Sequence, residues 1–131
     1  MSSVPSPLDY ALRAYGRLRS RVYIDRGGPE NTVIINGVAR SGTTWVGGVI
    51  QQLLGYRAIF EPFFPFYVPA SADCGYFPFA DAATDDFPEL DAFAERVMAG
   101  RIRGRWVDRD NRRLVFPGRL IKEIRLAFCL G

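Results

Sequence analysis

Residues Thr32 to Trp45 read T-V-I-I-N-G-V-A-R-S-G-T-T-W. The three β-branched residues at 33–35 predict a buried strand. Two glycines bracket the turn at 37–42, and residues 43–54 can form a helix that begins at this turn. Backbone N–H groups at the amino terminus of such a helix carry partial positive charge, so the pattern is typical of a phosphate-binding loop.

This loop differs from the nucleoside-triphosphate-binding P-loop in one position. The spacing G-x-x-x-x-G over 37–42 matches the start of a P-loop, but Thr43 stands where the P-loop lysine is found. The cation is instead Arg40, inside the turn. Its planar guanidinium, together with the hydroxyls of Ser41, Thr43 and Thr44, suits a single phosphate better than a triphosphate. An ordinary strand-to-helix turn is the alternative interpretation.

Three short blocks carry a resemblance to a known family. R-S-G-T-T-W at 40–45 resembles the 5′-phosphosulfate-binding loop of sulfotransferases that use 3′-phosphoadenosine 5′-phosphosulfate (PAPS). I-F-E-P-F at 59–63 is similar to a segment after the second strand of carbohydrate-type and bacterial members. L-I-K-E-I-R at 120–125 is similar to the strand with a Lys-x-x-Arg pattern that precedes the 3′-phosphate site. The blocks follow each other in the order that the family has.

The resemblance implies transfer of a sulfuryl group from PAPS to a hydroxyl or amine of a small-molecule, carbohydrate or lipid acceptor, without a metal ion. It also implies which residues bind the nucleotide: Arg40, Ser41, Gly42, Thr43, Thr44 and Trp45. Arg40 is then expected to neutralise the charge that grows on the leaving phosphate. Trp45 is expected to stack on the adenine, and the alternative is that it packs between helix and sheet.

Two further residues are candidates for catalysis. Glu61 follows the second predicted strand, at the strand ends where α/β sheets bind ligands. Because the chain has no histidine, a carboxylate is the natural base for an acceptor hydroxyl; otherwise Glu61 caps a turn or pairs with Arg57. Lys122 interrupts an apolar strand and needs an anionic partner such as Glu61. Arg125 is expected on the opposite face of that strand, away from Lys122.

The fold that the resemblance implies is an α/β, P-loop-NTPase-like three-layer sandwich around a parallel sheet. Residues 1–131 are expected to be the N-terminal part of one sulfotransferase-like domain, incomplete at the C-terminal side, with a loose tail over 1–7. The 3′-phosphate site of the family needs an Arg and a Ser in a later R-D-P-like context, and the sequence has no such segment after Arg125. We therefore expect this chain to be inactive or weak, and an uncovered sheet edge to favour a homo-oligomer.

The rest of the chain supplies further predicted elements. Helices are expected over 8–23 and 88–99, strands over 56–60 and 119–126, and a short strand over 114–116. The helix over 8–23 has one apolar face and is expected to pack on the sheet, or else to contact a membrane or partner. The aromatic- and proline-rich loop over 60–79 is expected to shape the acceptor pocket. Solvated loop charges are expected at Asp85, Asp86, Arg101, Arg103 and Arg105.

Composition limits the function without deciding it. The chain is 48% hydrophobic, which suits a single globular domain, and its net charge of +3 fits an anionic ligand but is too small to indicate nucleic acid. Cys74 and Cys129 lack the spacing of a metal site and are expected to be reduced thiols. The amino terminus lacks the pattern of a secretory signal, so a cytoplasmic protein is the default.

Two other functions compete with sulfuryl transfer. A P-loop kinase or NTPase would need the missing lysine, and usually an apolar strand that ends in an aspartate for Mg²⁺, where this chain has Lys122 and Glu123. A non-catalytic fragment that only binds anions is the second alternative.

Overall fold

The computed structural model describes residues 6–74 and 87–125 of the chain. It is a mixed α/β structure with two small parallel sheets. The elements in chain order are α1 (Pro7–Arg21), β1 (Ile24–Asp25), η1 (Pro29–Asn31), β2 (Thr32–Asn36), α2 (Thr43–Leu54), β3 (Arg57–Phe60), η2 (Pro69–Cys74), α3 (Pro88–Met98), β4 (Val115–Phe116) and β5 (Arg119–Glu123). Most of the expected loose tail, the acidic residues at 81–86 and Cys129 lie outside the described residues.

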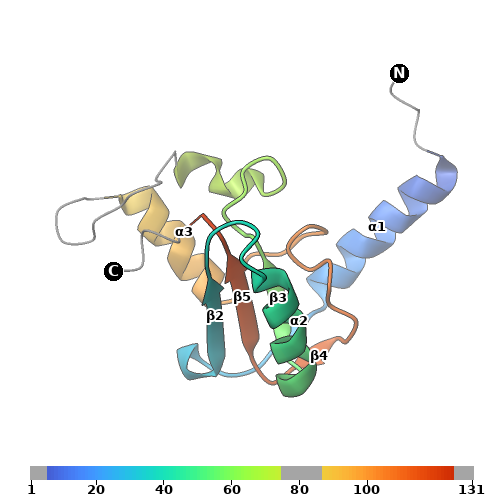
Figure 1. Ribbon diagram of the computed structural model, residues 1–131. Coiled ribbons are helices and arrows are strands. Elements are labelled where there is room, and N and C mark those ends of the chain that lie inside the picture. The colour runs from blue at the N-terminus through green and yellow to red at the C-terminus, as the bar shows by residue number, and fades with distance from the viewer. Residues whose placement is uncertain (1–5, 75–86, 126–131) are drawn as a thin grey trace.

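The larger sheet has the strand order β2-β5-β3, with both pairs parallel. Its three strands run side by side in Figure 1, and the segment that follows β2 arches over their upper ends to α2. The smaller sheet joins β1 to β4. The predicted helices and strands are therefore confirmed, with ends that shift by no more than three residues.

One helix packs on each face of the larger sheet. On one face lies α2, where a Cβ added at Gly47 would be 3.6 Å from Ile35 and 3.9 Å from Leu120. On the other face α3 forms the main hydrophobic core with Ile59 and Ile121. Because side chains of a strand alternate between faces, Lys122 shares the α2 face with Leu120.

Two predictions about packing are wrong. Ile34 in the middle of β2 is 43% exposed, so this strand is not buried. It is an edge strand, and within the described residues no further strand pairs with its outer side. The helix α1 does not pack on the sheet but projects away from it (Figure 1), and its apolar residues Leu8, Leu12 and Tyr15 are each more than half exposed. None of the described helices has the length and apolar content that a membrane crossing requires.

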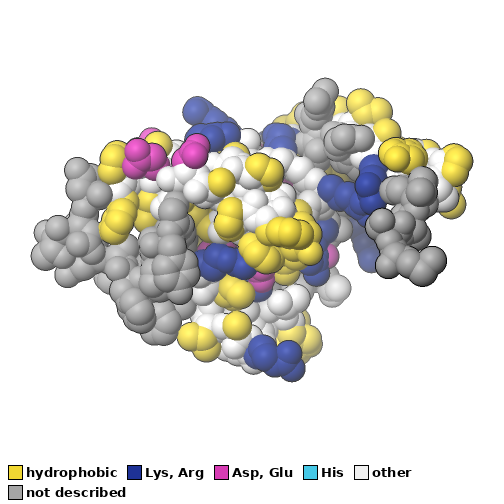
Figure 2. Space-filling view, turned by 90° about the horizontal axis from the view of Figure 1, so that it is seen from above, with side chains coloured by type: hydrophobic (Ala, Val, Ile, Leu, Met, Phe, Trp, Pro, Cys, Tyr) yellow, Lys and Arg dark blue, Asp and Glu magenta, His cyan; other side chains and the backbone are white. Residues whose placement is uncertain are grey.

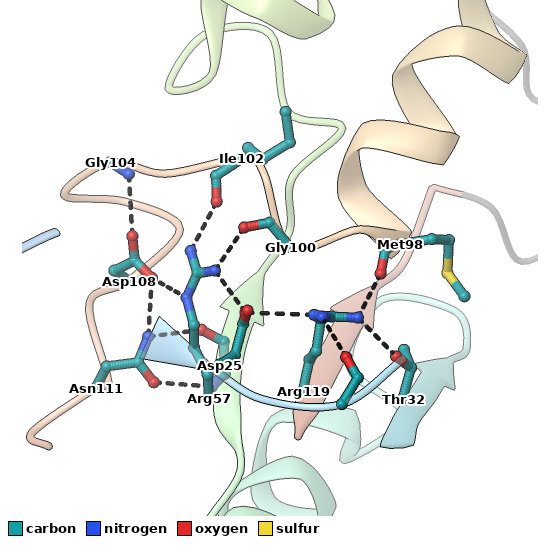
Figure 3. A network of polar contacts seen from close by, with 12 residues as sticks. Asp25, Thr32, Arg57, Met98, Gly100, Ile102, Gly104, Asp108, Asn111 and Arg119 are labelled. Atoms are coloured by element: carbon teal, nitrogen blue, oxygen red, sulfur yellow. Dashed lines mark hydrogen bonds and ion pairs between the residues drawn. The ribbon is translucent and has the colours of Figure 1, made fainter. Parts of the chain in front are cut away.

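A buried polar network ties together the amino-terminal ends of the strands (Figure 3). Its centre is Arg57, which is 0% exposed at the start of β3. The guanidinium donates from Nε to Asp108 Oδ1 at 2.8 Å and from Nη1 to Asp25 Oδ2 at 2.9 Å. Its remaining hydrogen bonds go to the carbonyl oxygens of Gly100 and Ile102. All these partners come from segments distant in sequence, so Arg57 holds several loops against the sheet.

Two neighbours extend this network across the sheet. Arg119, the first residue of β5, lies 3.3 Å from Asp25 Oδ2 and donates to the Thr32 hydroxyl. Asn111 pairs its side-chain amide with both the N–H and the carbonyl of Ala58, each at 2.8 Å. That side chain thus covers the outer edge of β3, which leaves β2 as the open edge of the described sheet.

Candidate functional site

The turn between β2 and α2 contains two residues with a left-handed backbone. Arg40 has a φ of 64° and Gly42 a φ of 83°, both in the left-handed region. The N–H of Ser41 donates to the Val38 carbonyl at 3.2 Å, so this amide is used within the turn. The helix α2 then begins at Thr43, and no side chain among the described residues caps it. The first N–H groups of a helix have no intrahelical partner, so those of α2 can bind an anion.

The predicted loop residues are accessible to a ligand. Arg40, Ser41, Gly42 and Thr44 are exposed, and Thr43 is half-buried. Trp45 is 75% exposed, so the alternative that it packs between helix and sheet is wrong.

Glu61 lies directly after β3, beside Lys122. Its N–H donates to the Lys122 carbonyl at 2.7 Å, which extends the pairing of β3 with β5 by one residue. Its carboxylate forms an ion pair and hydrogen bond with Lys122 Nζ. Glu61 is 8% exposed and Lys122 is 7% exposed. The expected anionic partner of Lys122 is therefore confirmed, whereas the alternative pairing of Glu61 with Arg57 is wrong.

Arg125 also reaches Glu61, contrary to the prediction from strand alternation. Its Nη1 lies 3.6 Å from Glu61 Oε2, and its guanidinium carbon lies 3.9 Å from the centre of the Phe64 ring. The alternation fails because β5 ends at Glu123, two residues before Arg125. Two cations therefore flank one buried carboxylate at the carboxyl ends of the strands.

Glu123 is a site residue that the sequence reasoning missed. Its fully buried carboxylate accepts hydrogen bonds from the N–H groups of Phe63 at 2.9 Å, Ile124 at 2.8 Å and Arg125 at 2.9 Å. It thereby fixes the segment after Glu61 against the turn after β5. The signal was a carboxylate at the end of an apolar strand, which must find hydrogen-bond donors when buried.

The backbone is strained at two of the predicted site residues. Among residues 6–74 and 87–125, Arg40 and Glu61 are the non-glycine residues with positive φ, at 64° and 39°. A left-handed conformation costs a non-glycine residue about 1–2 kcal/mol. Such strain clusters at functional sites. Glycine would fit both positions with less strain, so the presence of Arg and Glu points to a role for their side chains.

A cleft of about 530 Å³ joins the first turn of α2 to Lys122. It lies between α2 and the segment 109–113. Among the described loop residues, Thr44 alone lines it. Figure 2, which looks onto the upper ends of the strands, shows basic and acidic side chains together among hydrophobic ones near the middle of this face. The structure thus brings Thr44, Lys122 and, through its ion pair, Glu61 to one site.

The remaining predicted charges and the thiol that the structure describes lie outside this site. Arg101, Arg103 and Arg105 are exposed, as predicted, and Asp85 and Asp86 fall outside the described residues. Cys74 is a free thiol, as expected. Burial raises the pKa of the Cys74 thiol, which disfavours the reactive thiolate at neutral pH.

Comparisons with protein-family models, curated proteins and solved structures found no match to this chain. The function proposed below therefore depends on the three sequence blocks and on the geometry of the site.

Proposed function

We propose that this chain binds PAPS at the β2–α2 loop and transfers its sulfuryl group to a hydroxyl or amine. One observation carries the proposal. Thr44, in the first turn of the uncapped helix α2, lines the same cleft as Lys122, which is paired with the buried carboxylate of Glu61. The amino terminus of a helix and the lysine that pairs with the candidate base thus line one cavity.

The loop supplies the binding part of this function. The amides at the start of α2 and the hydroxyls of Thr43 and Thr44 bind the 5′-phosphate. Arg40, exposed beside them, neutralises charge on the leaving phosphate. Trp45 has a free ring face and stacks on the adenine.

The carboxylate supplies the chemical part. The acceptor oxygen or nitrogen attacks sulfur, the bond from sulfur to the phosphate oxygen breaks, and the acceptor proton passes to Glu61. Lys122 holds the Glu61 carboxylate in place through its ion pair. Glu123, whose carboxylate is already occupied by three backbone N–H groups, is poorly placed to hold Mg²⁺, which disfavours the kinase alternative.

The finer assignment of the fold belongs to the same proposal. A parallel strand, an anion-binding turn, a helix on one face and a second helix on the other follow in the order expected of a P-loop-like three-layer domain. The open edge of β2 is where such a domain has room for further strands.

Calorimetry with three ligands tests the proposal. We expect 3′-phosphoadenosine 5′-phosphate, the product nucleotide, to bind more tightly than ATP with Mg²⁺ and than inorganic phosphate. Preference for ATP with Mg²⁺ would instead support a kinase or NTPase. Equal affinity for the product nucleotide and inorganic phosphate would support a site that only binds anions.

Replacing Arg40 by glycine separates its structural from its functional role. Glycine relieves the left-handed strain, so the free energy of unfolding should be unchanged or raised by up to about 1 kcal/mol. Loss of the guanidinium should slow sulfuryl transfer by about ten- to a few-hundred-fold, because a charge-assisted hydrogen bond contributes about 1.5–3 kcal/mol.

Urea denaturation and a transfer assay on the same preparation measure both effects. Arg40→Lys is the matched control, since it keeps the charge but loses the planar fork. Its rate of transfer should fall between those of the unaltered chain and Arg40→Gly. Near-normal transfer by Arg40→Gly would remove Arg40 from the mechanism.

A further inference from the structure

Arg109 is a cation at the cleft that the proposed chemistry does not use. Its guanidinium carbon lies 3.9 Å from the centre of the Phe60 ring and 4.9 Å from that of Trp106. Its Nε lies 3.7 Å from Asp110 Oδ2, and both side chains are partly exposed. Such an exposed ion pair contributes little to stability. Stacking on aromatic rings, in contrast, orients a guanidinium and leaves its in-plane N–H groups able to bind an anion.

More cations than carboxylates line the cleft as a whole. Lys122, whose charge is balanced by its ion pair with Glu61, has its Nζ 4.7 Å from the centre of the same Phe60 ring that Arg109 contacts. Arg112 and Arg113 also line the cleft, and Asp110 is the one carboxylate among the described residues that line it. A cleft lined mainly by one sign of charge raises the local concentration of ligands of the opposite sign.

The other walls of the cleft are apolar or carry amides. Phe60, Phe116, Gln51 and Gln52 are among the residues that line it, and Gln51 Nε2 donates to Asn111 Oδ1 at 3.2 Å. Its volume of about 530 Å³ is that of a small-ligand site. The lining therefore suits a ligand with an apolar face, hydroxyl groups and a negative charge.

We propose that this cleft binds the acceptor of the reaction, that the acceptor is a small hydroxyl-bearing anion with an apolar face, and that Arg109 binds its anionic group. This inference rests on the proposed function, because the acceptor must lie near Glu61. It assigns the acceptor to the α2 side of the sheet, where Phe60 is the one described residue of the aromatic-rich loop 60–79 that lines the cleft.

A matched pair of probes tests the charge preference. Para-nitrophenyl glucuronide carries a ring, hydroxyls and a carboxylate, and para-nitrophenyl glucoside differs by lacking the carboxylate. By calorimetry with the full chain, we expect the glucuronide to bind at least about ten-fold more tightly, as a charge-assisted hydrogen bond requires. Arg109→Gln should abolish this preference, and Arg101→Gln, an exposed arginine outside the cleft, should leave it unchanged.

A second pair of variants tests the location. Gly48 lies in α2 and lines the cleft, and a Cβ added there meets no atom within 4 Å. Gly48→Trp should therefore fill the cleft and weaken glucuronide binding by about ten-fold or more, as expected when a pocket is occupied. Gly48→Ala, with the same backbone change but little volume, should keep it.

The outcomes separate this inference from the proposed function. Binding of the glucuronide that depends on Arg109 and Gly48, with no binding of 3′-phosphoadenosine 5′-phosphate, would support the anion cleft and overturn sulfuryl transfer. Binding of the nucleotide, with equal affinity for glucuronide and glucoside, would overturn the anionic acceptor alone. A glucuronide preference that survives both Arg109→Gln and Gly48→Trp would place the anion elsewhere and overturn the inference.

Discussion

Replacing Arg57 by methionine should lower the free energy of unfolding by about 3–5 kcal/mol, because it removes the cation from a buried ion network. The change leaves Asp108 without its cationic partner and Asp25 with Arg119 alone. Methionine has a long unbranched side chain and keeps part of the packing. The loss of stability should therefore come mainly from the missing charge and less from the change in side-chain volume. Urea denaturation followed by circular dichroism measures the effect.

Two further variants identify the cause of this loss. Arg101→Met changes an exposed arginine and should alter stability by no more than about 0.5 kcal/mol. In a background of Asp108→Asn, Arg57→Met should cost less, because the uncompensated carboxylate is no longer there. Additive effects of the two substitutions would contradict a coupled network.

The helices and strands could be predicted because their patterns are local. The β-branched run of β2, the glycines that flank α2, and the Pro88 and Gly100 that flank α3 each act within a few residues. The network around Arg57 could not be predicted in this way. Arg57 is separated from Asp108 by 51 residues and Thr32 from Arg119 by 87, and no local pattern decides which buried charges meet.

The burial of the elements also depends on tertiary structure. An apolar strand such as β2 and an amphipathic helix such as α1 predict a partner surface, but not whether the described residues provide one. Both predictions of burial failed for this reason.

The part of the site that lies at the carboxyl ends of the strands could be predicted from the sequence. Glu61 and Lys122 come from neighbouring parallel strands, so their meeting follows from topology once β3 and β5 pair. The predicted position of Arg125 was wrong, because an apolar run in the sequence does not show at which residue β5 ends. Arg109 and the cleft were missed, because the cleft forms between α2 and a loop more than fifty residues later in the chain.

Replacing Glu61 by glutamine should slow sulfuryl transfer by about a hundred- to ten-thousand-fold, the usual range for loss of a general base. The amide has the shape of the carboxylate and can still accept a hydrogen bond from Lys122, but the buried Lys122 loses its counter-charge, so the fold should lose some stability. The amide cannot take the acceptor proton. Single-turnover assays with the chain in excess over PAPS measure the transfer step directly, even when turnover is weak.

Nucleotide affinity is the readout that separates chemistry from structure in this variant. Glu61 lies after β3, whereas the proposed phosphate contacts come from the β2–α2 loop, so Glu61→Gln should bind 3′-phosphoadenosine 5′-phosphate as the unaltered chain does. Loss of both binding and transfer would mean that the Glu61–Lys122 pair only supports the fold. Full transfer by Glu61→Gln would exclude the carboxylate as base. The acceptor proton would then leave by another route, and the strained backbone at Glu61 would need a different explanation.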